Sequence, residues 1–528
     1  MVVWLVLVVV GFGQGDPTVV MTTNGPIQGQ VNKNTLVWSG VPFAAPPVGA
    51  NRLRPPQPVQ PWTDVKQCTH EGNVCPQVDL DGIVFYGDED CLNLDVYVPI
   101  TVNQTGLLPV MVWFYGGGWT FGDKYEFGLY DATALVESQQ HIHVAPNYRL
   151  NGLGFLALSE LMSEGHTTGN YGLLDQLAAL QWVQQNIKAF GGDPNQVTIF
   201  GESAGAFSVC WHLVNPASAG LFRAAIMESG TCDSPDFFTP LDQAYAWGYE
   251  YAAMLGCNDR SNILNCLRAV PTETFLNLNF PSTPANAPRL YPLMPWAAVI
   301  DGVALPGLPL DLIKAGKFQK VPLVVGTNHD EGDIFLFAFA AAFPNVSLPI
   351  TEEVLRTLLH RFFNDSATEL IIAEYQDQPT WEVACSLILR DFFFGCSARR
   401  IAAAFSKFGG ASPAYLYHFT FDPDWIDYKI LGQYHSSEIE FVFNNPWPPL
   451  VHEFDANCKT MAAAMGKYWD NLARFKNPNG DGSSGLPKWS VYDPSTEPIV
   501  RLDVPVVPEN DYLGGVCDFW DKIQEASN

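Results

Sequence analysis

The chain has 528 residues, of which 47% are hydrophobic and 16% charged, a composition that indicates a large folded core and argues against disorder. Its length alone predicts roughly two to four domains. The net charge of −27 is repelled by phosphate backbones and anionic membranes, so nucleic acid is not an expected partner and the acidic character is interpreted as a solvated surface.

Residues 1–15 have the apolar run of a secretory signal peptide. Gly13 and Gly15 supply the small residues of a cleavage site. The stretch lacks a positively charged start, and its alternative interpretation is a buried first strand. No later segment holds about 18 uninterrupted apolar residues, and the C-terminus carries neither a retention signal nor a hydrophobic tail, so no transmembrane anchor is expected. The sequence predicts a secreted protein.

The glycosylation sequons and the cysteines are also consistent with secretion. Three N-x-S/T sequons mark Asn103, Asn345 and Asn364 as predicted glycosylation sites. Eleven cysteines permit disulfides in an oxidising compartment, but the number is odd, so at least one thiol is free.

Strand-like and helix-like segments alternate along the rest of the chain. Apolar residues repeat with a helical period from Leu173 to Ile187, and Gly191-Gly192 ends that helix. Strand-like runs are found at 94–98, 110–114, 142–146, 197–200, 224–227, 322–326 and 415–420. Strands separated by helices predict an α/β fold with a large, mostly parallel central sheet flanked by helices. We expect the Pro-rich stretch 281–295 to be an insertion beside the sheet, and residues 16–528 to form a single domain despite the length.

The segment Gly201-Glu202-Ser203-Ala204-Gly205 reads G-x-S-x-G between the strand-like run at 197–200 and a helix-like run at 204–213. A serine at a strand-to-helix turn needs small neighbours, so that the backbone can turn sharply and present the hydroxyl. The pentapeptide alone is a weak signal in a chain with 44 glycines, and it predicts a nucleophile only if the chain also supplies a base, an acid and an oxyanion hole.

Chain order selects the partners of Ser203. The chain has ten histidines, so composition cannot choose the base. Glu331 follows the strand-like run at 321–326, and His435 lies in a turn before residues 438–441. Serine, acid and histidine in this order are typical of α/β-hydrolases.

A glycine-rich turn supplies the candidate oxyanion hole. Tyr115-Gly116-Gly117-Gly118-Trp119 comes directly after the strand-like run at 110–114. Successive glycines allow backbone N–H groups to point at a developing oxyanion, and the amide of Ala204 is a further donor.

These features resemble the type-B carboxylesterase/cholinesterase family of α/β-hydrolases, over nearly the whole chain after the leader. The matching segments are residues 89–94, 115–119 with Gly122, 147–149, 169–176, 190–194, 201–205, 330–332, and 435 with 438–441. The resemblance implies an α/β-hydrolase fold with helical and loop insertions around an active-site gorge. It also implies an enzyme that uses no cofactor and no metal.

Carried over position by position, the resemblance implies roles for named residues. Ser203 would be the nucleophile, Glu331 the acid and His435 the base. The oxyanion donors would be the amides of Gly117, Gly118 and Ala204. The implied disulfides are Cys75–Cys91, Cys257–Cys266 and Cys396–Cys517, and the implied buried ion pairs are Arg52–Glu89 and Arg149–Asp175. Five cysteines are then left over, most of them interpreted as buried inert thiols: Cys68, Cys210, Cys232, Cys385 and Cys458.

The sequence departs from the cholinesterase pattern at the positions that bind a quaternary ammonium. The loop from Cys75 to Cys91 contains no tryptophan, and Ile334 stands where a cholinesterase carries an aromatic residue. A cation–π site built from the remaining rings would be weak, so choline esters are not the expected substrates. The segment 290–296, with Phe335 and Phe441, either favours hydrophobic acyl or alcohol groups or packs in the core.

The sequence therefore predicts a secreted serine carboxylic-ester hydrolase that acts on hydrophobic small-molecule esters. A lipase or cholesterol-esterase-like hydrolase is the first alternative, because a mobile lid leaves no mark in the sequence. A non-catalytic adhesion protein of the same fold is the second, but such relatives lack part of the triad, and all three positions are intact here. The oligomeric state is left open.

Overall fold

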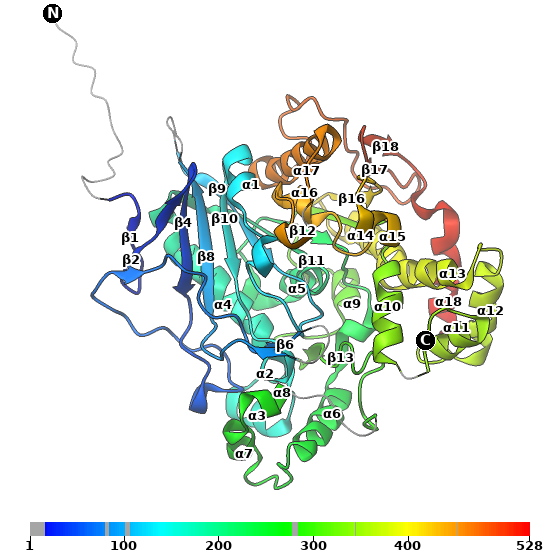
Figure 1. Cartoon of the computed structure of the whole chain (residues 1–528), viewed down its shortest axis with the longest axis horizontal. Helices are drawn as coiled ribbons and strands as arrows, with labels where there is room; N and C mark the ends of the chain where they lie inside the picture. The colour runs from blue at the N-terminus through cyan, green and yellow to red at the C-terminus, as the bar shows by residue number, and fades with distance from the viewer. Residues whose placement is uncertain are drawn as a thin grey trace, which may run out of the picture.

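The computed structural model describes residues 16–79, 84–100, 106–276, 283–343, 345–450 and 452–527. The predicted signal peptide at residues 1–15 and the sequon asparagine Asn103 lie outside these ranges. Figure 1 shows the strands of the central sheet in the interior, with helices packed around them.

A large mixed sheet forms the centre of the described chain. Its eleven strands, in spatial order, are β18 (Val507–Glu509), β17 (Ile499–Leu502), β16 (Ala414–Phe419), β15 (Leu323–Asn328), β12 (Ala224–Glu228), β11 (Gly192–Glu202), β9 (Leu108–Phe114), β10 (Ile142–Pro146), β8 (Asn93–Pro99), β4 (Thr35–Pro42) and β3 (Gln30–Asn32). Every pairing from β17 to β10 is parallel, whereas β18 at one edge and β8, β4 and β3 at the other pair antiparallel. The α/β fold class is confirmed, and the sheet is parallel in its middle.

Three smaller sheets lie outside it. They are formed by β1 (Val19–Met21), β2 (Pro26–Gln28) and β5 (Lys66–Gln67), by β6 (Gln77–Val78) and β7 (Phe85–Tyr86), and by β13 (Phe238–Pro240) and β14 (Ala298–Ile300).

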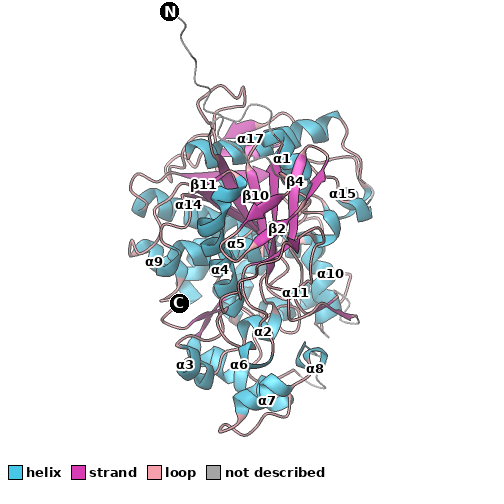
Figure 2. Cartoon of the chain, turned by 90° about the vertical axis from the view of Figure 1, so that its left-hand side faces the viewer, coloured by secondary structure: helices cyan, strands magenta, loops and turns pink. Residues whose placement is uncertain are grey.

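Helices cover both faces of the large sheet, as Figure 2 shows. One face is covered by α4, α5 and α14 and the other by α1 and α17, while α9 packs on α5 and α14, and α16 packs on α1 and α17. The helices are α1 (Thr133–Gln139), α2 (Asn151–Phe155), α3 (Ser159–Gly165), α4 (Tyr171–Asn186), α5 (Ala204–Val214), α6 (Leu241–Met254), α7 (Ile263–Ala269), α8 (Thr272–Leu276), α9 (Pro309–Lys314), α10 (Asp333–Ala342), α11 (Glu352–Leu359), α12 (Asp365–Tyr375), α13 (Trp381–Leu389), α14 (Cys396–Phe408), α15 (Ile426–Leu431), α16 (Ile439–Phe443), α17 (Ala456–Phe475) and α18 (Val516–Ser527).

The continuous apolar runs of the sequence become the central strands. All residues of β8, β9, β10, β12 and β15 are buried, as expected for strands covered on both faces. Helix α4 ends at Asn186, because residues Ile187–Phe190 continue as a 3-10 turn before Gly191 adopts a φ of 88°. Strand β11 is longer than the run at 197–200, since Gly192 already pairs with Leu108 across an irregularity.

The disulfides correct one part of the cysteine prediction. Cys75–Cys91, Cys257–Cys266 and Cys396–Cys517 are formed, and so is a fourth bridge, Cys210–Cys232. The prediction that left Cys210 and Cys232 unpaired was therefore wrong. Helix α5 packs on the parallel pair β11 and β12, so the chain leaving β12 passes beside the helix, and the two Cα atoms lie 5.4 Å apart. Cys68, Cys385 and Cys458 are free and buried.

Two buried ion pairs hold the segments that the resemblance picked out. Arg52 donates to Glu89 with Nε–Oε2 at 2.8 Å. Arg149 forms a two-point pair with Asp175, both contacts at 2.7 Å. Because these side chains are buried against each other, they act in the fold rather than in the chemistry.

Candidate active site

Ser203 occupies the turn between β11 and α5 in a strained conformation. Its φ of 53° and ψ of −123° lie in a region that residues with a side chain rarely adopt. The turn brings the backbone of the helix against the end of β9. A Cβ at Gly205 would lie 1.8 Å from the carbonyl oxygen of Phe114, and one at Gly201 would lie 2.6 Å from the same atom. Only glycine fits these two positions, which explains the G-x-S-x-G spacing.

Backbone hydrogen bonds hold this turn against the next strand. The N–H of Ser203 donates to the carbonyl oxygen of Glu228, at the end of β12, over 2.9 Å. The carbonyl of Ser203 accepts the first helical bond of α5, from Phe207 at 3.0 Å. Ser203 is partly exposed while both neighbouring residues are buried. The fold thus fixes the serine backbone and leaves its hydroxyl within reach of a ligand.

His435 and Glu331 meet although 104 positions separate them in the chain. Nδ1 of His435 lies 2.6 Å from Oε2 of Glu331, and both side chains are buried. The other carboxylate oxygen of Glu331 accepts the backbone N–H of Asn328, at the end of β15, over 2.8 Å. A carboxylate can only accept, so Nδ1 is protonated, and in the neutral imidazole Nε2 is the nitrogen without a proton.

The free Nε2 of His435 faces the residue next to the serine. It lies 3.1 Å from Oε1 of Glu202, yet it has no well-aligned hydrogen bond among the described residues. The hydroxyl of Ser436 donates to that same Oε1 over 2.6 Å. Burial disfavours the charged imidazolium, but the carboxylates of Glu202 and Glu331 outweigh burial and raise the pKa of His435 to about 9.

The glycine turn after β9 lies directly beside Ser203. Gly117 and Gly118 have φ values of 89° and 60°, left-handed conformations that reverse the chain. A Cβ at Gly116 would lie 3.1 Å from Cβ of Ser203 and 2.5 Å from Oε2 of Glu202, so the turn packs closely on the serine. A Cβ at Gly118 would meet the side chain of Met294, which brings the 290–296 segment to the same turn.

Aromatic rings surround the histidine. The rings of Phe335 and Phe394 lie 5.0 and 4.8 Å from the ring of His435, centre to centre. The sequence pointed to Phe335 but not to Phe394, which lies in a π-helical turn at Arg390–Gly395 that no sequence pattern marked. Phe441, in contrast, is fully buried among other rings, so its core-packing alternative applies.

Two further buried carboxyl groups were given no role from the sequence, although Glu438 lies in one of the matching segments. Glu438 accepts from the side chain of Asn328 at 2.5 Å, and Glu228 accepts from the indole of Trp469 at 2.8 Å. Burial, with the nearby carboxylates, raises the pKa of Glu438 to about 8 and raises that of Glu228 as well. The available signal was position, because Glu228 ends strand β12 and Glu438 lies three residues after His435.

Within the described chain, no helix is both long and apolar enough to cross a membrane.

Three comparisons identify proteins that the chain is similar to. A model of the carboxylesterase family matches residues 16–520. An acylcarnitine hydrolase of Mus musculus is 32% identical, with 95% of this chain and 90% of the relative covered. Cocaine esterase of Homo sapiens is also 32% identical, over 98% of this chain and 94% of that protein.

The structure has a close counterpart among solved structures. A PNB esterase superimposes with a TM-score of 0.80 at 32% identity, covering 96% of this chain and 100% of the other. Acetylcholinesterase of Electrophorus electricus is 32% identical over 97% of this chain and 89% of its own length. The fold is that of the α/β-hydrolases, and the chain belongs to the carboxylesterase family.

Proposed function

We propose that the protein is a secreted serine carboxylic-ester hydrolase that works through a covalent acyl-enzyme. Ser203 is the nucleophile, His435 the general base and Glu331 the acid that orients the histidine. The contact of 2.6 Å between His435 and Glu331 carries the proposal, because it leaves Nε2 as the free nitrogen beside the strained serine turn.

The proposed reaction assigns one step to each of these residues. Nε2 of His435 takes the hydroxyl proton as Oγ of Ser203 bonds to the ester carbonyl carbon, and the resulting oxyanion is held by the amides of Gly117, Gly118 and Ala204. Collapse breaks the bond to the alcohol oxygen, which receives the proton from His435. Water then attacks the acyl-enzyme by the same route, releasing the acid and restoring Ser203.

Hydrophobic esters are the substrates that the surroundings favour. Phe335 and Phe394 pack on His435, and Met294 packs on the glycine turn, so apolar side chains lie beside the histidine and the turn. Three relatives are named for acylcarnitine, cocaine and acetylcholine, which are all esters that also carry a positively charged nitrogen. Ile334 and the loop without tryptophan still disfavour choline esters.

Secretion is supported by features in several parts of the chain. Four disulfides fit an oxidising compartment, and residues 1–15 read as the signal peptide that would lead there. Asn345 and Asn364 are exposed, as glycosylation requires.

One cluster of buried apolar side chains extends from Val20 to Ile523, which supports residues 16–528 as a single domain.

A substrate series tests the proposal on the purified mature protein. p-Nitrophenyl esters of increasing acyl length, choline esters and an emulsified long-chain triacylglycerol are compared, with Ser203→Ala as the control. We expect hydrolysis of the soluble hydrophobic esters and loss of that activity in Ser203→Ala, with an organophosphate adduct on Ser203 by peptide mass. A folded protein without hydrolysis or adduct would overturn the enzyme proposal, and preference for the emulsion would favour the lipase alternative.

A further inference from the structure

We propose that Gln77, oriented by Tyr86, is a positioning residue that sets the glycine turn of the oxyanion hole. The inference builds on the proposed esterase function and adds a residue outside the triad. Gln77 lies in β6, two positions after Cys75, and is fully buried. It belongs to the first disulfide loop, which joins the rest of the chain at Cys75–Cys91.

The carboxamide of Gln77 uses every hydrogen-bonding site that it has. Its Nε2 donates to the carbonyl oxygens of Gly122 and Cys75, each over 3.0 Å. Its Oε1 accepts the backbone N–H of Gly122 at 2.7 Å and the hydroxyl of Tyr86 at 2.8 Å. Two donors and two lone pairs are thereby satisfied. Since Gln77 bonds both backbone groups of Gly122, it fixes the position and the orientation of that residue.

Gly122 in turn lies against the start of the glycine turn. It has a φ of 103°, and a Cβ there would lie 3.0 Å from the ring of Tyr115 and 3.4 Å from the carbonyl oxygen of Gly116. Between these ends, the N–H groups of Thr120 and Phe121 both donate to the carbonyl of Gly117. The segment from Gly116 to Gly122 is therefore a closed loop, and a shift of Gly122 is transmitted to the amides of Gly117 and Gly118.

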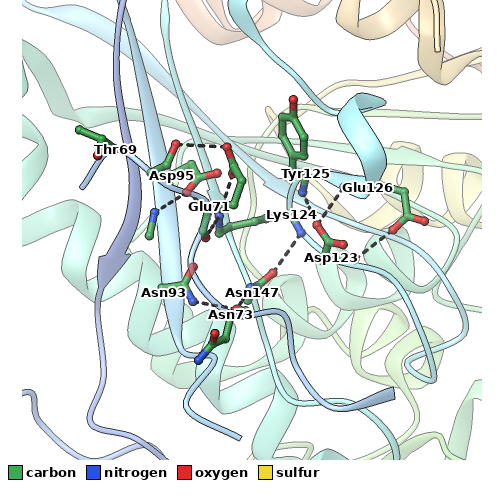
Figure 3. A network of polar contacts seen from close by, with 12 residues as sticks. Thr69, Glu71, Asn73, Asn93, Asp95, Asp123, Lys124, Tyr125, Glu126 and Asn147 are labelled. Atoms are coloured by element: carbon green, nitrogen blue, oxygen red, sulfur yellow. Dashed lines mark hydrogen bonds and ion pairs between the residues drawn. The ribbon is translucent and has the colours of Figure 1, made fainter. Parts of the chain in front are cut away.

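A second anchor holds the chain just beyond Gly122. Figure 3 shows the side chain of Lys124 extending toward Asp95 and Glu71. Its Nζ lies 2.5 Å from Oδ1 of Asp95 and 2.7 Å from the backbone oxygen of Glu71, and its backbone N–H donates to Asn147. The Lys124 contact is a buried charge pair, whose loss would destabilise the whole fold. Gln77 is neutral, so its removal tests the position of the turn with less damage to folding.

The position of the glycine turn matters because oxyanion catalysis is sensitive to small displacements of the donor amides. The amide donors must lie about 3 Å from the oxygen of the transition state, and one donor is worth about 100- to 1,000-fold in rate. Ground-state binding depends far less on these amides. A displaced turn thus lowers kcat and the affinity for a tetrahedral analogue, whereas KM changes little.

The test replaces Gln77 by an isosteric apolar residue, Gln77→Met, and removes one of its bonds in Tyr86→Phe. Gln184→Met is the matched control, because the Gln184 amide also donates to two backbone carbonyls, those of Pro194 and Leu221. For each protein, kcat and KM are measured per serine titrated with an organophosphate. The inhibition constant of a trifluoromethyl ketone and the melting temperature are measured alongside.

We expect Gln77→Met to lower kcat by about tenfold or more, with KM within about threefold and the ketone weakened in proportion to kcat/KM. Tyr86→Phe should shift kcat and the ketone in the same direction by a smaller factor, and Gln184→Met should change neither. Unchanged kcat and ketone affinity in both loop variants, or a loss confined to melting temperature, would overturn the inference. If the wild-type chain has no titratable serine, the proposed function fails instead.

Discussion

Nδ1 of His435 lies 2.6 Å from Oε2 of Glu331, and Oε1 of Glu331 accepts the N–H of Asn328. The carboxylate is thus fixed by the end of β15, and it fixes the imidazole in turn. A carboxamide could retain the shape of this contact but would present an N–H group to Nδ1, which favours the wrong tautomer of His435.

Glu331→Gln is therefore expected to lower kcat by about 1,000- to 10,000-fold with little change in folding. Steady-state hydrolysis of p-nitrophenyl butyrate, with circular dichroism for folding, measures both effects. Asp330→Asn is the matched control, since Asp330 instead contacts His329 and the backbone of Gln433. An equal loss in both variants would show that the assignment of Glu331 as the acid is wrong.

The pH dependence of kcat/KM reports on Glu202. The Glu202 carboxylate favours the charged form of His435 and contributes to its raised pKa of about 9. The general base must be neutral, so activity rises as the pH increases through that value. Glu202→Gln removes a negative charge 3.1 Å from Nε2, which lowers the pKa of His435 and moves the acid limb to lower pH.

The expected displacement of this limb is about one pH unit or more. Profiles of kcat/KM between pH 5 and pH 10 should be recorded for wild type and Glu202→Gln. Ser436→Ala serves as the comparison, because it keeps the carboxylate and removes only the hydroxyl bonded to it. A limb that stays in place or moves to higher pH in Glu202→Gln would contradict the electrostatic role.

The sequence predicted those parts of the site that depend on strand ends. Ser203 and Glu331 each follow a buried apolar run, and parallel strands bring such ends to one edge of the sheet. The contacts of Glu202 and Gln77 could not be predicted, since they depend on side-chain directions in loops. The bridge between Cys210 and Cys232 was missed because their spacing of 22 residues does not reveal that α5 packs beside the chain leaving β12.

Gly205→Ala tests why the serine turn needs glycine. The new methyl group would lie 1.8 Å from the carbonyl oxygen of Phe114, a backbone atom that cannot move without shifting β9. We expect a loss of about 3 kcal/mol or more in the free energy of unfolding by urea, or failure to fold. Gly307→Ala is the control, because its methyl group would lie at an ordinary contact distance of 3.6 Å from Leu312. Its free energy of unfolding should stay within about 1 kcal/mol of wild type. Equal unfolding midpoints in the two variants would mean that the turn is not tightly packed.

The bridge between Cys210 and Cys232 should stabilise helix α5, which follows directly after Ser203. It joins residues that are 22 positions apart, whereas Cys396 and Cys517 are 121 positions apart. The entropy that a cross-link removes from the unfolded chain grows slowly with this separation. Removing the shorter bridge by the double change to alanine should cost about 3 kcal/mol in unfolding free energy, and removing the longer one about 5 kcal/mol.

Cys385→Ala, at a buried free thiol, controls for the loss of sulfur packing. Urea unfolding without reductant measures all three, and thiol titration of the wild type should find three free cysteines after denaturation. Five free thiols, with no stability loss beyond that of Cys385→Ala, would show that the shorter bridge does not form.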